Sequence, residues 1–175
     1  MKAPIMASAE PGQDEWRDLW RDYGSRLLLF ARQQTRGRSD AEDVVQEAFV
    51  RYWRARQSDP GLSPTLMYTM VRRIAIDHAR RAEGRLATEA RAAALAERDA
   101  GWFADPVETQ ERKDRLEEAL RGLPVVQREV MVLKVWGGLT FEQIGETLDV
   151  SPNTAASRYR YALEALRHTL TPAVL

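Results

Sequence analysis

The sequence contains no cysteine, so disulfide bonds and thiolate metal sites are excluded. Its two histidines, His78 and His168, lie far apart in the chain and make a poor metal site. No apolar run approaches the roughly 20 residues of a membrane-spanning helix, and residues 1–13 lack the apolar stretch of a secretory signal. We therefore expect a cytoplasmic protein without membrane insertion, and we expect no metal or cofactor site.

The chain also lacks an excess of either charge, because 26 basic residues balance 26 acidic ones. This balance argues against a protein that holds DNA alone by neutralising many phosphates. The charges are unevenly distributed, however. Residues 40–47 carry four acidic and no basic side chains, whereas residues 69–85 carry five arginines against two acids. This alternation indicates separate surfaces for separate partners.

A third absence is that of alternating strand patterns, since helical periodicity dominates the sequence. We predict an all-α fold of two small helical domains joined by a flexible linker. The helices of the first domain are expected over about 14–35, from Ser39 to the Asp59-Pro60-Gly61 turn, and from Ser63-Pro64 to Gly84. The predicted organisation is a disordered tail over 1–13, a first domain over 14–85, a linker over 86–106 and a second domain over 107–175.

Local signals predict where individual helices begin. Ser39 with Glu42, and Thr140 with Gln143, both fit the capping box, in which two side chains satisfy backbone N–H groups at a helix start. Ser63-Pro64 fits an N-cap followed by proline at the first helical position. The apolar stripe that contains Phe49, Tyr52 and Trp53 is interpreted as core rather than interface. In the second domain, a helix that begins at Pro124 is expected to direct Val126 inward.

Residues 140–166 give the sharpest functional signal. A short capped helix, a tight turn at 149–151 and a second capped helix from Ser151-Pro152 predict a helix-turn-helix. Gly145 is small where the two helices should come close, and Val150 should anchor the turn to the core. By spacing, the outer face of the second helix is small, polar and basic, which suits base edges and phosphates in the major groove. We predict that this face contains Asn153, Thr154, Ala156, Ser157, Arg158, Arg160 and Tyr161.

Three segments carry a family resemblance: AEDVVQEAFVRYWR, LMYTMVRRIAIDHARR and GLTFEQIGETLDVSPNTAASRYRYALEALR. Their order and spacing resemble the extracytoplasmic-function (ECF) group of the sigma-70 family. The resemblance covers about residues 14–85 and 107–170. It implies a sigma-2-like and a sigma-4-like domain, core RNA polymerase and promoter DNA as partners, and no enzyme activity. It also allows for an anti-sigma partner.

The resemblance assigns roles to three groups of residues. Asp40, Glu42, Asp43, Gln46 and Glu47 match the part that docks on the clamp of the polymerase β′ subunit, and an acidic surface there would steer a basic partner. The second domain is expected to contact the β flap and, through the predicted outer face, the −35 element. The residues that match the part that melts and reads the −10 element are Tyr68, Arg72, Arg73, Asp77, Arg80 and Arg81.

Two positions depart from the family pattern. The family often has Trp-Leu where this sequence has Leu66-Met67, and it often has Asn where this sequence has Arg73. Both lie in the predicted melting helix, so they bear on −10 specificity. For Tyr68, a buried structural role and a base-stacking role are both compatible with the sequence.

Two other functions remain open at this point. A stand-alone helix-turn-helix regulator would explain residues 140–170 but not the acidic capped helix from residue 39. A sigma-like adaptor would bind polymerase without supporting initiation. No nucleophile–base pair, metal cluster or cofactor motif suggests an enzyme.

Overall fold

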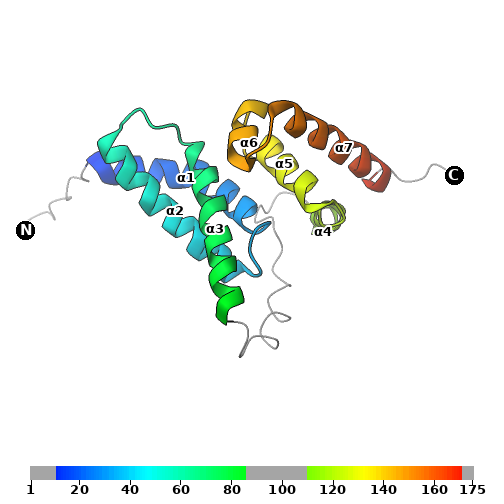
Figure 1. The fold of residues 1–175 in the computed structure, drawn as a ribbon, viewed down its shortest axis with the longest axis horizontal. Helices are drawn as coiled ribbons and strands as arrows, with labels where there is room; N and C mark the ends of the chain where they lie inside the picture. The colour runs from blue at the N-terminus through cyan, green and yellow to red at the C-terminus, as the bar shows by residue number, and fades with distance from the viewer. Residues whose placement is uncertain (1–10, 86–109, 171–175) are drawn as a thin grey trace, which may run out of the picture.

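The computed structural model describes the backbone of residues 11–85 and 110–170, and side chains over 14–81 and 114–170. Within these ranges the protein consists of seven α-helices and contains no strand. Figure 1 shows α1 to α3 gathered in one group and α4 to α7 in another. The predicted all-α class with two helical groups is confirmed. The predicted linker over 86–106 and residues 1–10 of the predicted tail lie outside the described residues, whereas residues 11–13 of that tail form the start of an α-helix.

The first group is a bundle of three long helices. These are α1 (Pro11–Ala31), α2 (Arg38–Ser58) and α3 (Leu66–Arg85), and each packs on the other two. Phe49 and Tyr52 are almost fully buried, as predicted, whereas Trp53 lies partly exposed at the edge. The ring of Trp16 meets Phe49 and Trp53 edge-on, with centroids 5.5 and 5.4 Å away. Aromatic contacts therefore hold the N-terminal part of α1 against α2.

The Ser39–Glu42 capping box is wrong. α2 begins two residues earlier than predicted, because its N-cap is Gly37 instead of Ser39, and Gly37 makes no side-chain cap bond. The carboxylate of Glu42 instead accepts a 2.7 Å hydrogen bond from Arg38, one turn back. A basic residue at the start of the helix thus competes with the backbone for the capping carboxylate.

The third helix also begins and ends later than predicted. Ser63 accepts the N–H of Leu66 in a turn, at 3.1 Å, so Ser63-Pro64 precedes α3 as a turn instead of capping it. α3 continues through Gly84 to Arg85. The turn before it is held by Tyr52, whose hydroxyl donates to the carbonyl of Leu62 at 2.8 Å.

The second group contains α4 (Gln110–Arg121), α5 (Val125–Val135), α6 (Phe141–Leu148) and α7 (Pro152–Leu170). Helices α4, α5 and α7 share a small core that includes Leu120, Met131 and Ala162. Pro124 precedes α5, and Gly138, with a φ of 69°, follows it. The prediction that Val126 points inward is wrong, because 43% of Val126 is exposed.

The two groups pack against each other, a feature that the sequence did not predict. α3 contacts α6, and α1 contacts α5. Figure 1 shows α6 beside the upper part of α3 and α5 beside the end of α1. One buried apolar cluster runs through both groups. From the second group it includes Val130, Val132, Leu133, Leu139, Ile144, Leu148 and Ala155.

Among the described residues, no helix is long and apolar enough to cross a membrane.

Candidate nucleic-acid and polymerase interfaces

The turn between α6 and α7 has the geometry of a helix-turn-helix. The predicted capping box of α6 is confirmed in both halves: Gln143 N–H donates to Thr140 Oγ1 at 3.2 Å, and Thr140 N–H donates to Gln143 Oε1 at 2.9 Å. Asp149 ends α6 in the left-handed region, with a φ of 57°. The side chain of Val150 packs on the main core, as predicted.

Gly145 allows the chain to turn back closely after α6. Its carbonyl accepts the N–H of Val150 at 2.9 Å. A Cβ at position 145 would lie 2.6 Å from the carbonyl oxygen of Val150, which no real side chain tolerates. The close approach predicted at Gly145 is therefore confirmed, although its partner is the backbone of the turn and not the body of α7.

The start of α7 is capped and open to solvent. Ser151 Oγ accepts the N–H of Thr154 at 3.0 Å, which fixes the first turn. Asn153 beside it is exposed. The start of α7 therefore presents an exposed side chain that can both donate and accept hydrogen bonds, which suits phosphates and base edges.

The outer face of α7 follows the predicted pattern. Asn153, Arg160 and Tyr161 are exposed, while Thr154, Ala156, Ser157 and Arg158 are partly exposed. The guanidinium of Arg160 lies 5.4 Å from the centre of the Tyr161 ring. This contact reduces the rotational freedom of an arginine that would otherwise move freely on the surface.

The residues expected to melt DNA are spread along α3 and do not share one environment. Arg73, Arg80 and Arg81 are exposed, whereas Arg72 and Asp77 are partly buried. His78 does not face its neighbour Asp77, because its ring reaches across to Glu47 on α2 at 3.4 Å.

Tyr68 is a buried structural residue in this arrangement. Its relative exposure is 0%, and its ring meets Phe30 edge-on at 5.8 Å. Within the part of the chain that the structure describes, its hydroxyl has no hydrogen-bond partner. Burial raises the pKa of Tyr68 to about 12. A base-stacking role for Tyr68 does not fit this geometry, because no ring face is accessible.

The residues of α2 that are predicted to dock on polymerase divide into two kinds. Asp40, Asp43 and Gln46 are exposed, whereas Glu42 is hydrogen-bonded to Arg38 and Glu47 to Arg51 and His78. Burial by itself raises the pKa of Glu47, but the hydrogen bond from Arg51 and the neighbouring charges outweigh it and lower that pKa. The exposed side chains are therefore the ones ready to meet a basic partner.

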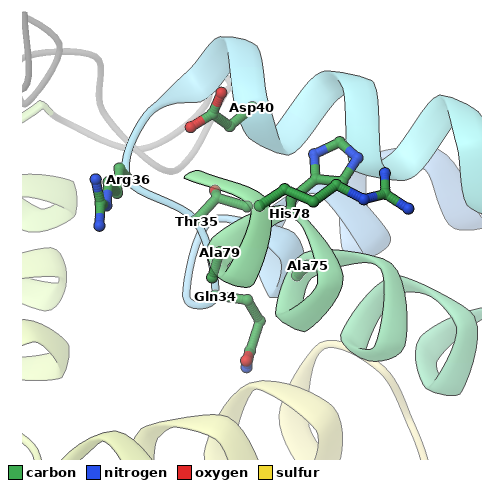
Figure 2. Close-up of a pocket in the computed structure, with 8 residues that line it drawn as sticks. Gln34, Thr35, Arg36, Asp40, Ala75, His78 and Ala79 are labelled. Atoms are coloured by element: carbon green, nitrogen blue, oxygen red, sulfur yellow. The ribbon is translucent and has the colours of Figure 1, made fainter. Parts of the chain in front are cut away.

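One cavity of about 170 Å³ lies between the start of α2 and the end of α3. It brings Asp40 of the acidic block together with His78 and Arg81 of the basic block, so these blocks are neighbours in space and not separate surfaces. Figure 2 shows the side chain of Gln34 pointing away from Asp40, towards α5. Gln34 and Arg36 also line the cavity, and nothing in the sequence pattern singled them out.

Comparisons with known proteins agree with this layout. The family pattern described as Sigma-70 region 2 matches residues 19–85, and the one described as Sigma-70, region 4, matches residues 113–166. The ECF RNA polymerase sigma factor SigE of Mycolicibacterium smegmatis is 32% identical over 161 residues, which span 89% of this chain and 61% of that protein. The ECF sigma factor SigK of Mycobacterium ulcerans is 30% identical over 134 residues, which span 74% of this chain and 72% of that protein.

Two solved structures share the fold. The sigma factor RpoE of Bartonella quintana, in complex with the anti-sigma factor NepR, superposes with a TM-score of 0.69 at 20% identity, over 92% of this chain and 99% of that one. CnrH, in complex with the cytosolic domain of CnrY, gives 0.57 at 21% identity, over 90% and 88% of the two chains. At these identities the likeness establishes the architecture.

Proposed function

Because this chain belongs to the ECF group of the sigma-70 family, we propose that it is an alternative sigma factor, which binds bacterial core RNA polymerase and directs it to promoters. The observation that carries the proposal is the presence, on one chain, of an acidic exposed helix and a capped helix-turn-helix with an open outer face. A stand-alone regulator needs only the second of these. In this proposal the protein works in the cytoplasm, alters the choice of start site and catalyses no reaction itself.

The exposed start of α7 is assigned to the −35 element. In this proposal Asn153 reads a base edge, which its exposure and an amide that both donates and accepts support. Arg158 and Arg160 would pair phosphates and set the register of the helix on the duplex. α3 is assigned to the −10 element through Arg73, Arg80 and Arg81, which are all exposed.

The exposed acidic part of α2 is assigned to the β′ clamp. Asp40 and Asp43 can meet a basic helix without first breaking the ion pairs described for Glu42 and Glu47. The second helical group would contact the β flap. NepR and the cytosolic domain of CnrY bind the structural relatives, and we propose a partner of the anti-sigma class for this chain as well.

The test is reconstitution with purified core polymerase. We expect the chain to be captured by the core enzyme and to direct transcription from a defined subset of promoters, with starts mapped by sequencing of 5′ ends. Asp43→Ala should weaken capture by about 2- to 5-fold, a typical effect for one partly screened charge at an interface. Asp22→Ala is the control, because Asp22 is an exposed acid on α1 and not on α2.

The outcomes separate the alternatives. Capture with selective initiation supports the sigma factor, and capture without initiation would instead identify an adaptor. Failure of capture, together with specific promoter binding by the chain alone, would identify a regulator.

A further inference from the structure

The turn between α2 and α3, residues 59–65, is attached to the three-helix bundle at Leu62. The side chain of Leu62 packs on the main apolar core. Its carbonyl accepts two hydrogen bonds, one from the Tyr52 hydroxyl at 2.8 Å and one from Arg56 Nη1 at 3.3 Å. Arg56 Nη1 also donates to the Tyr52 hydroxyl at 3.1 Å, so two side chains of α2 and the carbonyl form a closed triangle.

The start of α1 holds the same arginine. Nε and Nη2 of Arg56 both donate to Glu15 Oε1, at 2.8 and 2.5 Å. Figure 1 shows the first turns of α1 beside the last turns of α2, at the end of the bundle where residues 59–65 lie. We call Glu15, Tyr52, Arg56 and the carbonyl of Leu62 the turn anchor. It joins α1, α2 and the turn that leads into α3.

The turn anchor is more buried than the ion pairs within α1. The side chain of Arg56 is 24% exposed and Tyr52 is 0% exposed, whereas Arg17 and Arg21, which pair with acids of their own helix, are 68% and 70% exposed. An exposed ion pair contributes little to stability. A buried hydroxyl or carbonyl that loses its partner is costly, however. The turn anchor therefore fixes a position and does more than attract opposite charges.

The turn continues into α3 without a break in backbone hydrogen bonding. Three successive carbonyls accept three successive N–H groups, at 3.1, 3.0 and 3.1 Å: those of Ser63, Pro64 and Thr65 accept from Leu66, Met67 and Tyr68. Each bond spans three residues, the tight pattern that is common at helix ends. A movement of the turn at Leu62 would therefore be passed on to the first turn of α3.

The start of α3 is the part where −10 specificity is expected to reside. Leu66 and Arg73, the two departures from the family pattern, both lie in its first half, and Arg73 is exposed and assigned to the −10 element. Arg80 and Arg81 lie towards the other end, where Arg81 lines a cavity with the start of α2. Binding groups discriminate well only when supporting side chains hold them in place. Movement of the turn should therefore affect Leu66 and Arg73 before the other two arginines.

We propose that Arg56 is a positioning residue for −10 recognition, which fixes the α2–α3 turn, and with it the start of α3, through the turn anchor. This inference rests on the proposed function. Arg56 acts through Leu62 on residues that meet DNA and needs no DNA contact of its own. Its loss should leave core polymerase binding and −35 recognition intact and should weaken discrimination among −10 sequences.

The first test measures the two kinds of discrimination separately. Holoenzyme reconstituted with the full-length chain is assayed on a preferred promoter, on versions with one altered −10 base pair and on versions with one altered −35 base pair. We expect Arg56→Ala to reduce −10 discrimination by about 3- to 10-fold, the equivalent of one net hydrogen bond. Its −35 discrimination and its capture by core polymerase should change by less than about twofold, because neither site contacts the turn anchor.

Tyr52→Phe is a milder variant that keeps the buried ring and removes only the hydroxyl. It should reduce −10 discrimination in the same direction but by less than Arg56→Ala. The double variant should lose less than the product of the two separate effects, because both side chains hold the same carbonyl. Independent effects of the two substitutions would contradict a shared anchor.

Two control variants separate positioning from general stability. Arg54→Ala removes an exposed arginine two positions before Arg56 in α2, and it should change neither kind of discrimination. Leu27→Val removes one methylene from a fully buried side chain of α1, so it should destabilise the fold but spare −10 discrimination. The proposal is overturned by unchanged −10 discrimination in Arg56→Ala, by equal losses at both promoter elements, or by an equal −10 loss in Leu27→Val.

The second test observes the turn without DNA or polymerase. Amide hydrogen exchange in the free full-length chain reports the opening of individual hydrogen bonds. In Arg56→Ala, the N–H groups of Leu66, Met67 and Tyr68 should exchange about fivefold faster or more, while that of Arg80, near the other end of α3, should be unchanged. Unchanged exchange at the start of α3 would overturn the link between Arg56 and this helix.

The two proposals fail in different ways. If the wild-type chain directs no transcription, the proposed function is wrong, while the exchange rates still report whether Arg56 holds the turn. If the wild-type chain transcribes and Arg56→Ala keeps its full −10 discrimination, the function stands and the positioning role falls.

Discussion

At the scale of single residues, hydrogen-bonding side chains at helix ends decide where helices begin. Thr140 and Gln143 exchange two hydrogen bonds with each other's backbone, whereas Ser39 lies in the first turn of α2 without capping it. The same sequence pattern therefore has different outcomes at two places. The difference has a physical cause, since Glu42 has Arg38 as a competing partner.

This contrast predicts unequal effects of two similar substitutions. Thr140→Ala should lower the free energy of unfolding by about 1 kcal/mol, because it removes a working cap. Ser39→Ala should change it by less than about 0.5 kcal/mol. Urea unfolding followed by circular dichroism measures both. Equal losses in the two variants would mean that the cap at α6 does not differ from the start of α2.

Tyr68 gives the chain an alkaline sensitivity. Its pKa is raised to about 12 in the folded chain, from an ordinary value of about 10, so the unfolded chain ionises first as the pH rises. The contribution of Tyr68 to the free energy of unfolding is fully present below pH 10. It is lost between about pH 10 and 12, as the hydroxyl ionises in the unfolded chain. At pH 11 the loss is on the order of 1.4 kcal/mol.

Tyr68→Phe should therefore be as stable as wild type or slightly more stable at pH 7, because it also removes a buried hydroxyl without a partner among the described residues. Between pH 8 and 11 it should lose less stability than wild type. Tyr161→Phe, at a ring that is 53% exposed, is the control and should follow the wild-type curve. Parallel curves for wild type and Tyr68→Phe would contradict this.

At the scale of elements, the start and the end of α7 have different roles in the proposal. Asn153→Ala should reduce transcription from promoters with the preferred −35 sequence by about 5- to 150-fold, the equivalent of 1–3 kcal/mol of base discrimination. Promoters with altered −35 sequences should be affected less. Arg167→Ala, at an exposed arginine in the last turn, should have little effect on either set. A uniform loss over all sequences would assign Asn153 to the phosphate backbone instead.

Elements with strong local signals could be predicted from the sequence. The turn around Gly145, Asp149 and Val150 follows from a short capped helix and a second cap at Ser151, all within one stretch of chain. Helix boundaries do not follow from the sequence where local preferences compete, as at Ser63, where a turn precedes α3. Val126 was placed wrongly because an apolar side chain near a helix start need not face the core.

Contacts between distant segments could not be predicted in this way. Thr69 and Thr147 are ordinary polar residues in their own helices, and nothing in their spacing indicates that they meet. Gln34 and Glu129 are separated by 95 positions and have no shared pattern. Tyr68 illustrates the same limit, because the sequence allowed a buried or a stacking role and only the packing against Phe30 decides between them.

At the scale of the whole molecule, the neutral net charge and the two separate contact surfaces lead to the same expectation. A chain without net charge has little general attraction for DNA. Core polymerase would offset this weakness, because it holds two weak contacts at a fixed separation and makes the second contact intramolecular.

The central claim is that this chain reads promoters only together with core polymerase. It is tested most directly by measuring the affinity of the chain for one of its own promoters, with and without core polymerase, at the same salt concentration. We predict that the chain alone binds only in the non-specific range, with a Kd of about 10⁻⁴–10⁻⁶ M. With core polymerase the complex should bind at least a thousandfold more tightly and should discriminate against an altered −35 sequence. Nanomolar, sequence-specific binding by the chain alone would contradict the account and favour a stand-alone regulator.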